Sequence, residues 1–206
     1  MDLYLVVCIC IAILSIFSVG ESLFKNVKMS RIFVAVFLIL SVISFAFSEL
    51  YVLGLNFNIN FLLYLITFSI LMFKLKSIKS FLVMFLLASI SLALCACYNS
   101  INLLEYEFAY FQPYILLCFC LAILSCCITK DFTSTFCGLF VGISISELIR
   151  SQSMIYFSEN VFIMGNMQFS SLLLFSLAFY VLMLPARDFI IKKRQKYISK
   201  KMLKQN

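Results

Sequence analysis

The sequence predicts an all-α, polytopic bundle of transmembrane helices, and three observations lead to this class. Of the 206 residues, 64% are hydrophobic and only 12% are charged, and the mean hydropathy is +1.10. So little polar material cannot coat a soluble globule of this size. The apolar residues gather into stretches that match the roughly 17 to 25 helical residues needed to cross a membrane. Finally, fifteen of the sixteen Lys and Arg residues fall where these crossings leave one common side.

Seven apolar stretches are each predicted to cross the membrane once. They cover residues 3–19, 32–53, 57–73, 81–98, 111–128, 132–149 and 169–184. Membrane strands are not expected, because barrel strands alternate polar and apolar residues and these stretches do not. The third and seventh spans are the shortest, so six helices is the alternative. Pro113 is expected to start the fifth helix and Pro185 to end the seventh.

The basic residues predict the orientation of the bundle. They follow the first, third, fifth and seventh spans: Lys25, Lys28, Arg31, Lys74, Lys76, Lys79, Lys130, Arg187, Lys192, Lys193, Arg194, Lys196, Lys200, Lys201 and Lys204. The other side receives the polar turn with Asn56, Asn58 and Asn60, several acidic residues and a single basic residue, Arg150. Short segments rich in Lys and Arg stay in the cytoplasm during insertion. We therefore expect a multi-pass protein of the cell membrane with its N-terminus outside and its C-terminus in the cytoplasm.

The chain divides into a transmembrane bundle, residues 1–186, and a basic cytoplasmic tail, residues 187–206. Apolar residues of the tail fall near one face of a helix that is otherwise covered by Lys and Arg: Ile190, Ile191, Tyr197, Ile198 and Met202. Such a segment is typical of contact with anionic lipids of the inner leaflet, and docking of a protein partner is the alternative. Nucleic acid is not an expected partner despite the net charge of +7, because the basic residues are explained by the bilayer.

The chain contains no histidine, which excludes imidazole-based nucleophile activation and the histidine zinc motifs. The nine cysteines all lie inside predicted spans, where a C-x-C pair points its thiols to different sides of a helix. We expect no cofactor, no metal and no enzymatic activity. A thiol contact between Cys95 or Cys97 and Cys118 or Cys120 is the alternative to cysteine as an apolar filler.

Ionisable residues at membrane depth are costly and are therefore candidates for a function. Glu49 and Glu147 lie toward the outer ends of the second and sixth spans, and Arg150 follows Glu147 at an ion-pairing spacing. One interpretation is a structural pair near the membrane interface. The other is a polar site of Glu49, Glu147 and Arg150 at the outer mouth of the bundle. Some of the tyrosines near the outer surface would then lie in its wall instead of in an aromatic belt: Tyr51, Tyr98, Tyr106, Tyr110, Tyr114 and Tyr156.

Gly138 and Gly142 form a G-x-x-x-G pattern in the sixth span. Small residues at this spacing let another helix approach closely. We expect the pattern to pack a helix of the same chain, and a homodimer seam is the alternative.

One family resemblance can be traced along the chain. A basic segment follows the first span, residues 29–40 enter the second, and the glycine-containing sixth span leads through Gly142 to a polar segment with Met164, Gly165 and Asn166. This order of elements resembles that of the YphA-like integral membrane proteins of spore-forming Gram-positive bacteria. The resemblance implies a membrane protein linked to sporulation and supplies no catalytic residues.

Two classes of function remain open. The first is a non-enzymatic scaffold or subunit of a membrane assembly, which the absence of catalytic motifs favours. The second is a small-solute binding or transport subunit with an outward-facing polar site. Convergence of the outer carboxylates on a cavity would favour the second class.

Overall fold

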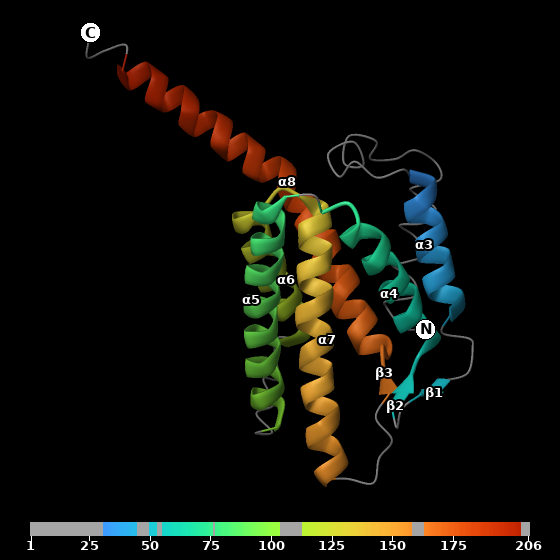
Figure 1. The fold of residues 1–206 in the computed structure, drawn as a ribbon. Helices are drawn as coiled ribbons and strands as arrows, with labels where there is room; N and C mark the ends of the chain where they lie inside the picture. Colours follow the sequence, from blue (N-terminus) through green and yellow to red (C-terminus); the bar gives the residue numbers. More distant parts are fainter. Residues whose placement is uncertain are drawn as a thin grey trace.

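The computed structural model describes residues 31–44, 50–52, 55–75, 77–103, 113–157 and 163–202. Within these residues the chain forms the helices α3 (Arg31–Ser44), α4 (Ile59–Met72), α5 (Ile78–Leu103), α6 (Pro113–Ile128), α7 (Phe132–Phe157) and α8 (Met167–Met202), and the strands β1 (Leu50–Val52), β2 (Leu55–Phe57) and β3 (Ile163–Met164). Successive helices run in alternating directions (Figure 1). The predicted helical class is confirmed in this part of the chain, apart from the strands. The first predicted span, residues 3–19, lies outside the described residues, so the total of seven helices stays a prediction.

Three of the described helices contain a segment that is long and apolar enough to cross a membrane. These segments are Ile78–Asn99, Phe132–Gln152 and Met167–Lys193. The helices α3 and α4 have 14 residues each and α6 has 16. At about 1.5 Å per residue these shorter helices reach only about 21 to 24 Å. In the described residues, therefore, three of the predicted spans have full membrane length.

The prediction that the second helix continues to residue 53 is wrong, because Leu50–Val52 is a strand. It pairs antiparallel with β2, and β2 pairs in parallel with β3 to complete a three-stranded sheet. Tyr51 and Val52 favour strands, and the neighbouring segments satisfy their backbone groups without a helix. After the sheet, Asn58 caps α4 by accepting the N–H of Asn60 at 2.9 Å.

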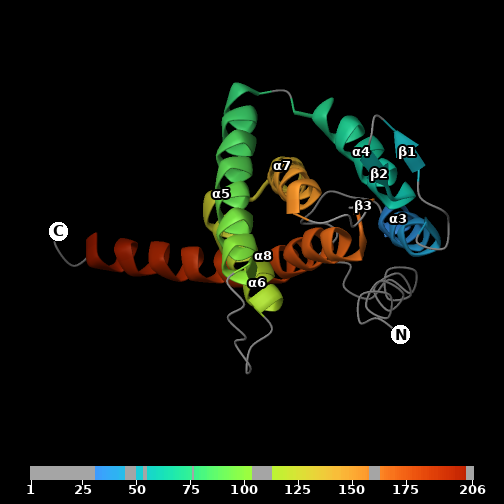
Figure 2. The same cartoon turned by 90° about the horizontal axis from the view of Figure 1, so that it is seen from below.

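Pro113 starts α6, as predicted, but the prediction that Pro185 ends the last helix is wrong. The helix α8 continues through this proline to Met202, so the predicted tail begins inside the helix. Proline removes one helical hydrogen bond, and contacts on the next turn hold α8 in place. Arg187 Nη1 donates to the Thr129 carbonyl at 2.8 Å, and Lys130 pairs with Asp188. Beyond these contacts α8 projects away from the other helices (Figures 1 and 2).

The most extensive helix contact joins α5 and α7. It depends on the two glycines of the G-x-x-x-G pattern, which lie against the backbone of α5. A Cβ atom at Gly142 would come within 2.5 Å of the Ala88 carbonyl oxygen, and one at Gly138 within 2.7 Å of Leu87 Cβ. No larger residue fits at this separation, so the glycines set how closely α5 and α7 approach.

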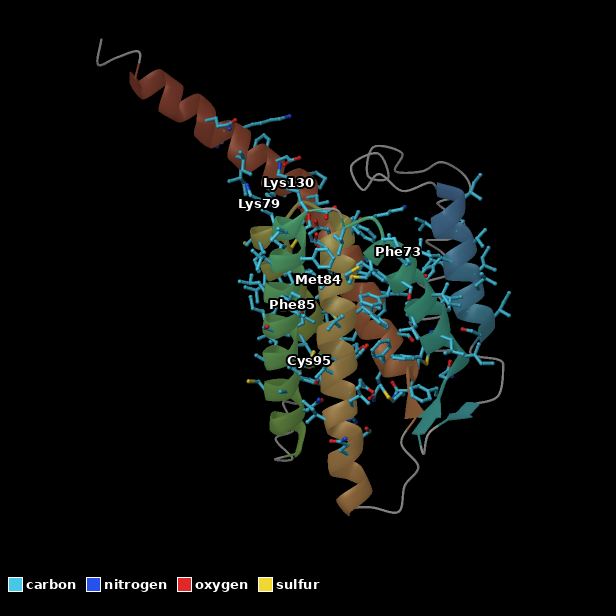
Figure 3. The ribbon with its side chains drawn as sticks, in the orientation of Figure 1. Phe73, Lys79, Met84, Phe85, Cys95 and Lys130 are labelled. Atoms are coloured by element: carbon cyan, nitrogen blue, oxygen red, sulfur yellow. The ribbon has the colours of Figure 1, made fainter. Side chains whose placement is uncertain are left out.

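The two ends of the helix bundle differ in charge. The connections α4–α5 and α6–α7 lie at one end, which we call the basic end, and Lys79 and Lys130 mark it in Figure 3. The small sheet lies at the opposite end, together with the C-terminal turns of α5 and α7 and the first turns of α6 and α8 (Figure 1). We call this opposite end the sheet end.

Candidate functional site

A cavity of about 90 Å³ lies between α5, α6, α7 and α8 near the sheet end. Each of the four helices contributes a polar residue to its wall: Tyr98 from α5, Tyr114 from α6, Glu147 and Arg150 from α7, and Gln168 from α8. The volume is sufficient for several water molecules or one small solute, since a single water needs only about 10 to 15 Å³ on this measure.

The charged residues of the cavity are Glu147 and Arg150, which lie one turn apart on α7. The Glu147 side chain is 10% exposed and that of Arg150 is 31% exposed. Glu147 Oε1 and Arg150 Nη1 are separated by 3.9 Å, which is too long for a hydrogen bond. Glu147 Oε2 is buried and has no hydrogen-bond partner among the described residues. Burial of a carboxylate with an unpaired oxygen is unfavourable unless a ligand or water supplies a donor.

Hydrogen bonds between helices fix the polar wall around this carboxylate. Asn99 Nδ2 donates to Ser146 Oγ at 3.2 Å, which joins α5 to α7. Arg150 Nη1 donates to Gln168 Oε1 at 3.4 Å, which joins α7 to α8. These neighbours hold the α7 segment that carries Glu147 while leaving the carboxylate itself facing the cavity.

The aromatic side of the cavity is formed by two tyrosines. The rings of Tyr98 and Tyr114 meet edge to face, with centroids 6.4 Å apart. Tyr114 donates its hydroxyl hydrogen to the Gln168 carbonyl and is 2.6 Å from Ser171 Oγ. The first turn of α8 is therefore tied to α6 on one side and to α7 on the other.

The start of α8 is defined by the two residues before it. Gly165 has φ = +73°, and a Cβ atom there would lie 2.4 Å from Phe61 Cβ. Only glycine fits this positive φ and this close approach. Asn166 then caps the helix by accepting the N–H of Phe169 at 2.9 Å. This turn places Gln168 beside Arg150.

The structure brings together two of the three predicted polar-site residues, Glu147 and Arg150, and Glu49 lies outside the described residues. The glycines Gly138 and Gly142 lie in the contact with α5. Cys95 lines the cavity, and the cysteines of α5 and α6 are free thiols. In the part of the chain that the structure describes, no group of three His, Cys, Asp or Glu residues is placed to hold a metal ion.

The sequence did not identify Asn99 and Gln168 as site residues. Both lie just outside predicted spans, 81–98 and 169–184, where neutral polar residues are ordinary. The usable signal would have been their position at the ends of helices that share the outer side with Glu147.

A second buried polar cluster, which we call the Asn60 cluster, joins α3, α4 and α8. Asn60 Oδ1 accepts from Ser41 Oγ at 3.0 Å, and Asn60 Nδ2 donates to Ser170 Oγ at 2.7 Å. Tyr64 OH lies 3.3 Å from Ser41 Oγ. All four residues are 0% exposed. The sequence grouped Asn60 with the polar turn at the start of the predicted span 57–73; in the structure α4 begins at Ile59, and Asn60 is buried in its first turn.

Comparison of the chain with protein family models, curated proteins and solved structures gives no significant match. The resemblance to the YphA-like proteins therefore stays a prediction.

Proposed function

We propose that the chain is a multi-pass protein of the cell membrane that binds a small polar solute in the Glu147 cavity. The observation that carries this proposal is that Glu147 lines a cavity while its carboxylate is nearly buried, with one oxygen, Oε2, that has no hydrogen-bond partner among the described residues. Groups of this kind at membrane depth are expensive and typically belong to a binding site. The solute enters from the sheet end, on the side away from the cytoplasm.

The orientation in this proposal is supported by the basic end. Lys74 and Lys130 lie in the connections at that end, Lys79 lies in the first turn of α5, and α8 carries Lys192 and Lys193 beyond it. Basic residues in short connections stay in the cytoplasm. Fusions of a fluorescent protein and of alkaline phosphatase after Asn206 test the orientation. Fluorescence with no phosphatase activity is expected, and an active phosphatase would contradict it.

A thermal-unfolding screen of the full chain in lipid nanodiscs tests solute binding. Amino acids, amines, carboxylates and polyols are added to the wild type and to the variant Glu147→Gln. At least one solute should raise the unfolding temperature of the wild type and have little effect on the variant, because binding to the folded state stabilises it. The matched control is Asp188→Asn, which makes the same chemical change at the basic end and should keep the wild-type response. If no solute distinguishes Glu147→Gln from the wild type, the proposal fails.

A second proposal, a scaffold or subunit of a membrane assembly, is favoured by the projecting part of α8. Phe189 and Ile190 are 68% and 63% exposed there, next to Lys192 and Lys193. Exposed apolar residues beside basic ones fit an anionic membrane surface or a partner helix. Flotation with vesicles of phosphatidylglycerol or of phosphatidylcholine distinguishes contact with an anionic membrane surface from contact with a partner helix. Preference for the anionic vesicles that Phe189→Ser weakens supports lipid contact, and equal binding to both vesicles contradicts it.

A further inference from the structure

The charges around the Glu147 cavity restrict the class of solute that it accepts. Among the described residues that line it, Glu147 and Arg150 are the ones with charged side chains, so the wall has a net charge of zero. A solute with a net charge would leave an unbalanced charge in a largely buried site, which is unfavourable. A neutral solute or a zwitterion avoids this penalty.

The geometry of the carboxylate favours the zwitterion. Ionised Glu147 only accepts hydrogen bonds; the residue lines the cavity, and its buried Oε2 has no hydrogen-bond partner among the described residues. An ammonium group is the strongest donor for such an oxygen, because both partners are charged. The 3.9 Å gap between Glu147 Oε1 and Arg150 Nη1 shows that the guanidinium does not saturate this carboxylate.

Arg150 provides the complementary half of the site. A guanidinium carries five N–H groups in one plane and binds carboxylates alongside its other contacts. The Arg150 side chain is also more exposed than that of Glu147, at 31% against 10%. A zwitterion can therefore enter with its ammonium group directed inward to Glu147 and its carboxylate held nearer the mouth by Arg150.

The volume limits the size of this solute. An apolar cavity of about 150 Å³ accommodates benzene, which has six heavy atoms. The Glu147 cavity has about 90 Å³. This proposal rests on the proposed binding function: we propose that the site takes a small zwitterion of the size of glycine or alanine, with an ammonium and a carboxylate group attached to the same carbon.

Four small probes of different charge test this class on the full chain in nanodiscs: glycine, methylammonium, acetate and acetamide. Affinities are measured from the rise of the unfolding temperature with probe concentration. Glycine should bind at least about tenfold more tightly than each of the other three, because only glycine satisfies both charged residues. Glu147→Gln and Arg150→Gln should each weaken glycine binding by about tenfold or more, whereas Asp188→Asn should leave it unchanged.

The ranking of the probes on the wild type decides the proposal even if a variant fails to fold. Acetate, methylammonium or acetamide binding as tightly as glycine would overturn the zwitterion class. If such a probe binds and Glu147→Gln abolishes its effect, the proposed binding function stands and only the class is wrong. If none of the probes and none of the screened solutes binds, both proposals fail.

Discussion

Two buried polar clusters occupy the sheet end, and they differ in how completely their hydrogen bonds are satisfied. In the Asn60 cluster, the side-chain oxygen and nitrogen of Asn60 each have a buried partner, on α3 and on α8. In the Glu147 cavity, the carboxylate has a loose ion pair and a buried oxygen with no described partner. The first cluster is neutral and closed, and the second is charged and adjoins a cavity.

This difference separates a structural role from a binding role. A fully satisfied polar network stabilises one arrangement of helices, because any shift leaves a buried group unpaired. A partly satisfied charged group lowers stability and is retained where activity needs it. Both types of cluster look alike in the sequence, as polar residues near the ends of apolar stretches. Their stability effects on substitution should have opposite signs.

The largest expected effect is that of Asn60→Leu. This change leaves Ser170 Oγ without its Asn60 donor and removes the Asn60 Oδ1 acceptor of the Ser41 hydroxyl, so the free energy of unfolding should fall by about 3 kcal/mol. Titration with a denaturing detergent in mixed micelles measures it. The control is Ser69→Ala on the same helix, where an exposed hydroxyl bonds only to its own helix and little change is expected. Equal effects of the two variants would show that the Asn60 cluster is not structural.

The next effect concerns the contact that positions the Glu147 cavity. Gly142→Ala places a Cβ atom 2.5 Å from the Ala88 carbonyl oxygen, so α5 must move away from α7. The unfolding free energy should fall by about 1 to 2 kcal/mol, since the higher helix propensity of alanine offsets part of the clash. The same titration applies, with Ile145→Ala on an exposed position of α7 as the control. A more stable Gly142→Ala variant would disprove the close approach.

Glu147→Gln should act in the opposite direction. The amide removes a largely buried charge with an unpaired oxygen, so the free energy of unfolding should rise by about 1 kcal/mol while solute binding is lost. Unfolding is measured without added solute, so that only the intrinsic stability is compared. A clear loss of stability would instead assign Glu147 a structural role with Arg150 and remove the contrast with Asn60.

The smallest effect is expected for Asp188→Asn at the basic end. This residue forms an exposed ion pair with Lys130, and exposed pairs are largely screened by water and salt. The unfolding titration should not distinguish this variant from the wild type. A substantial loss would show that the ion pair is needed to hold α8 past Pro185.

Part of the fold follows from local patterns alone. The long apolar runs around 81–98 and 132–149 locate α5 and α7, and Pro113 locates the start of α6. The errors occur where two local signals compete. Residues 50–52 are apolar enough for a helix but rich in strand-forming side chains, and pairing with β2 and β3 decides for the strand. At Pro185 the helix continues, and the hydrogen bond from Arg187 on the next turn to the Thr129 carbonyl of the α6–α7 connection compensates for the missing one.

The apolar helices, the segregation of the basic residues and the spacing of Glu147 and Arg150 follow from the amino-acid sequence alone. These properties depend on composition and on neighbours within one helical turn, which the chain order specifies. Only the tertiary structure decided that Asn60 meets Ser170, 110 positions away, and that Tyr98, Tyr114 and Gln168 surround Glu147. Such contacts depend on how each helix is rotated and how closely it packs against its neighbours. The rotation and the packing distance are set by residue pairs on different helices, such as Gly142 and Ala88. The same physics explains why the closed cluster and the open one were distinguishable only in three dimensions.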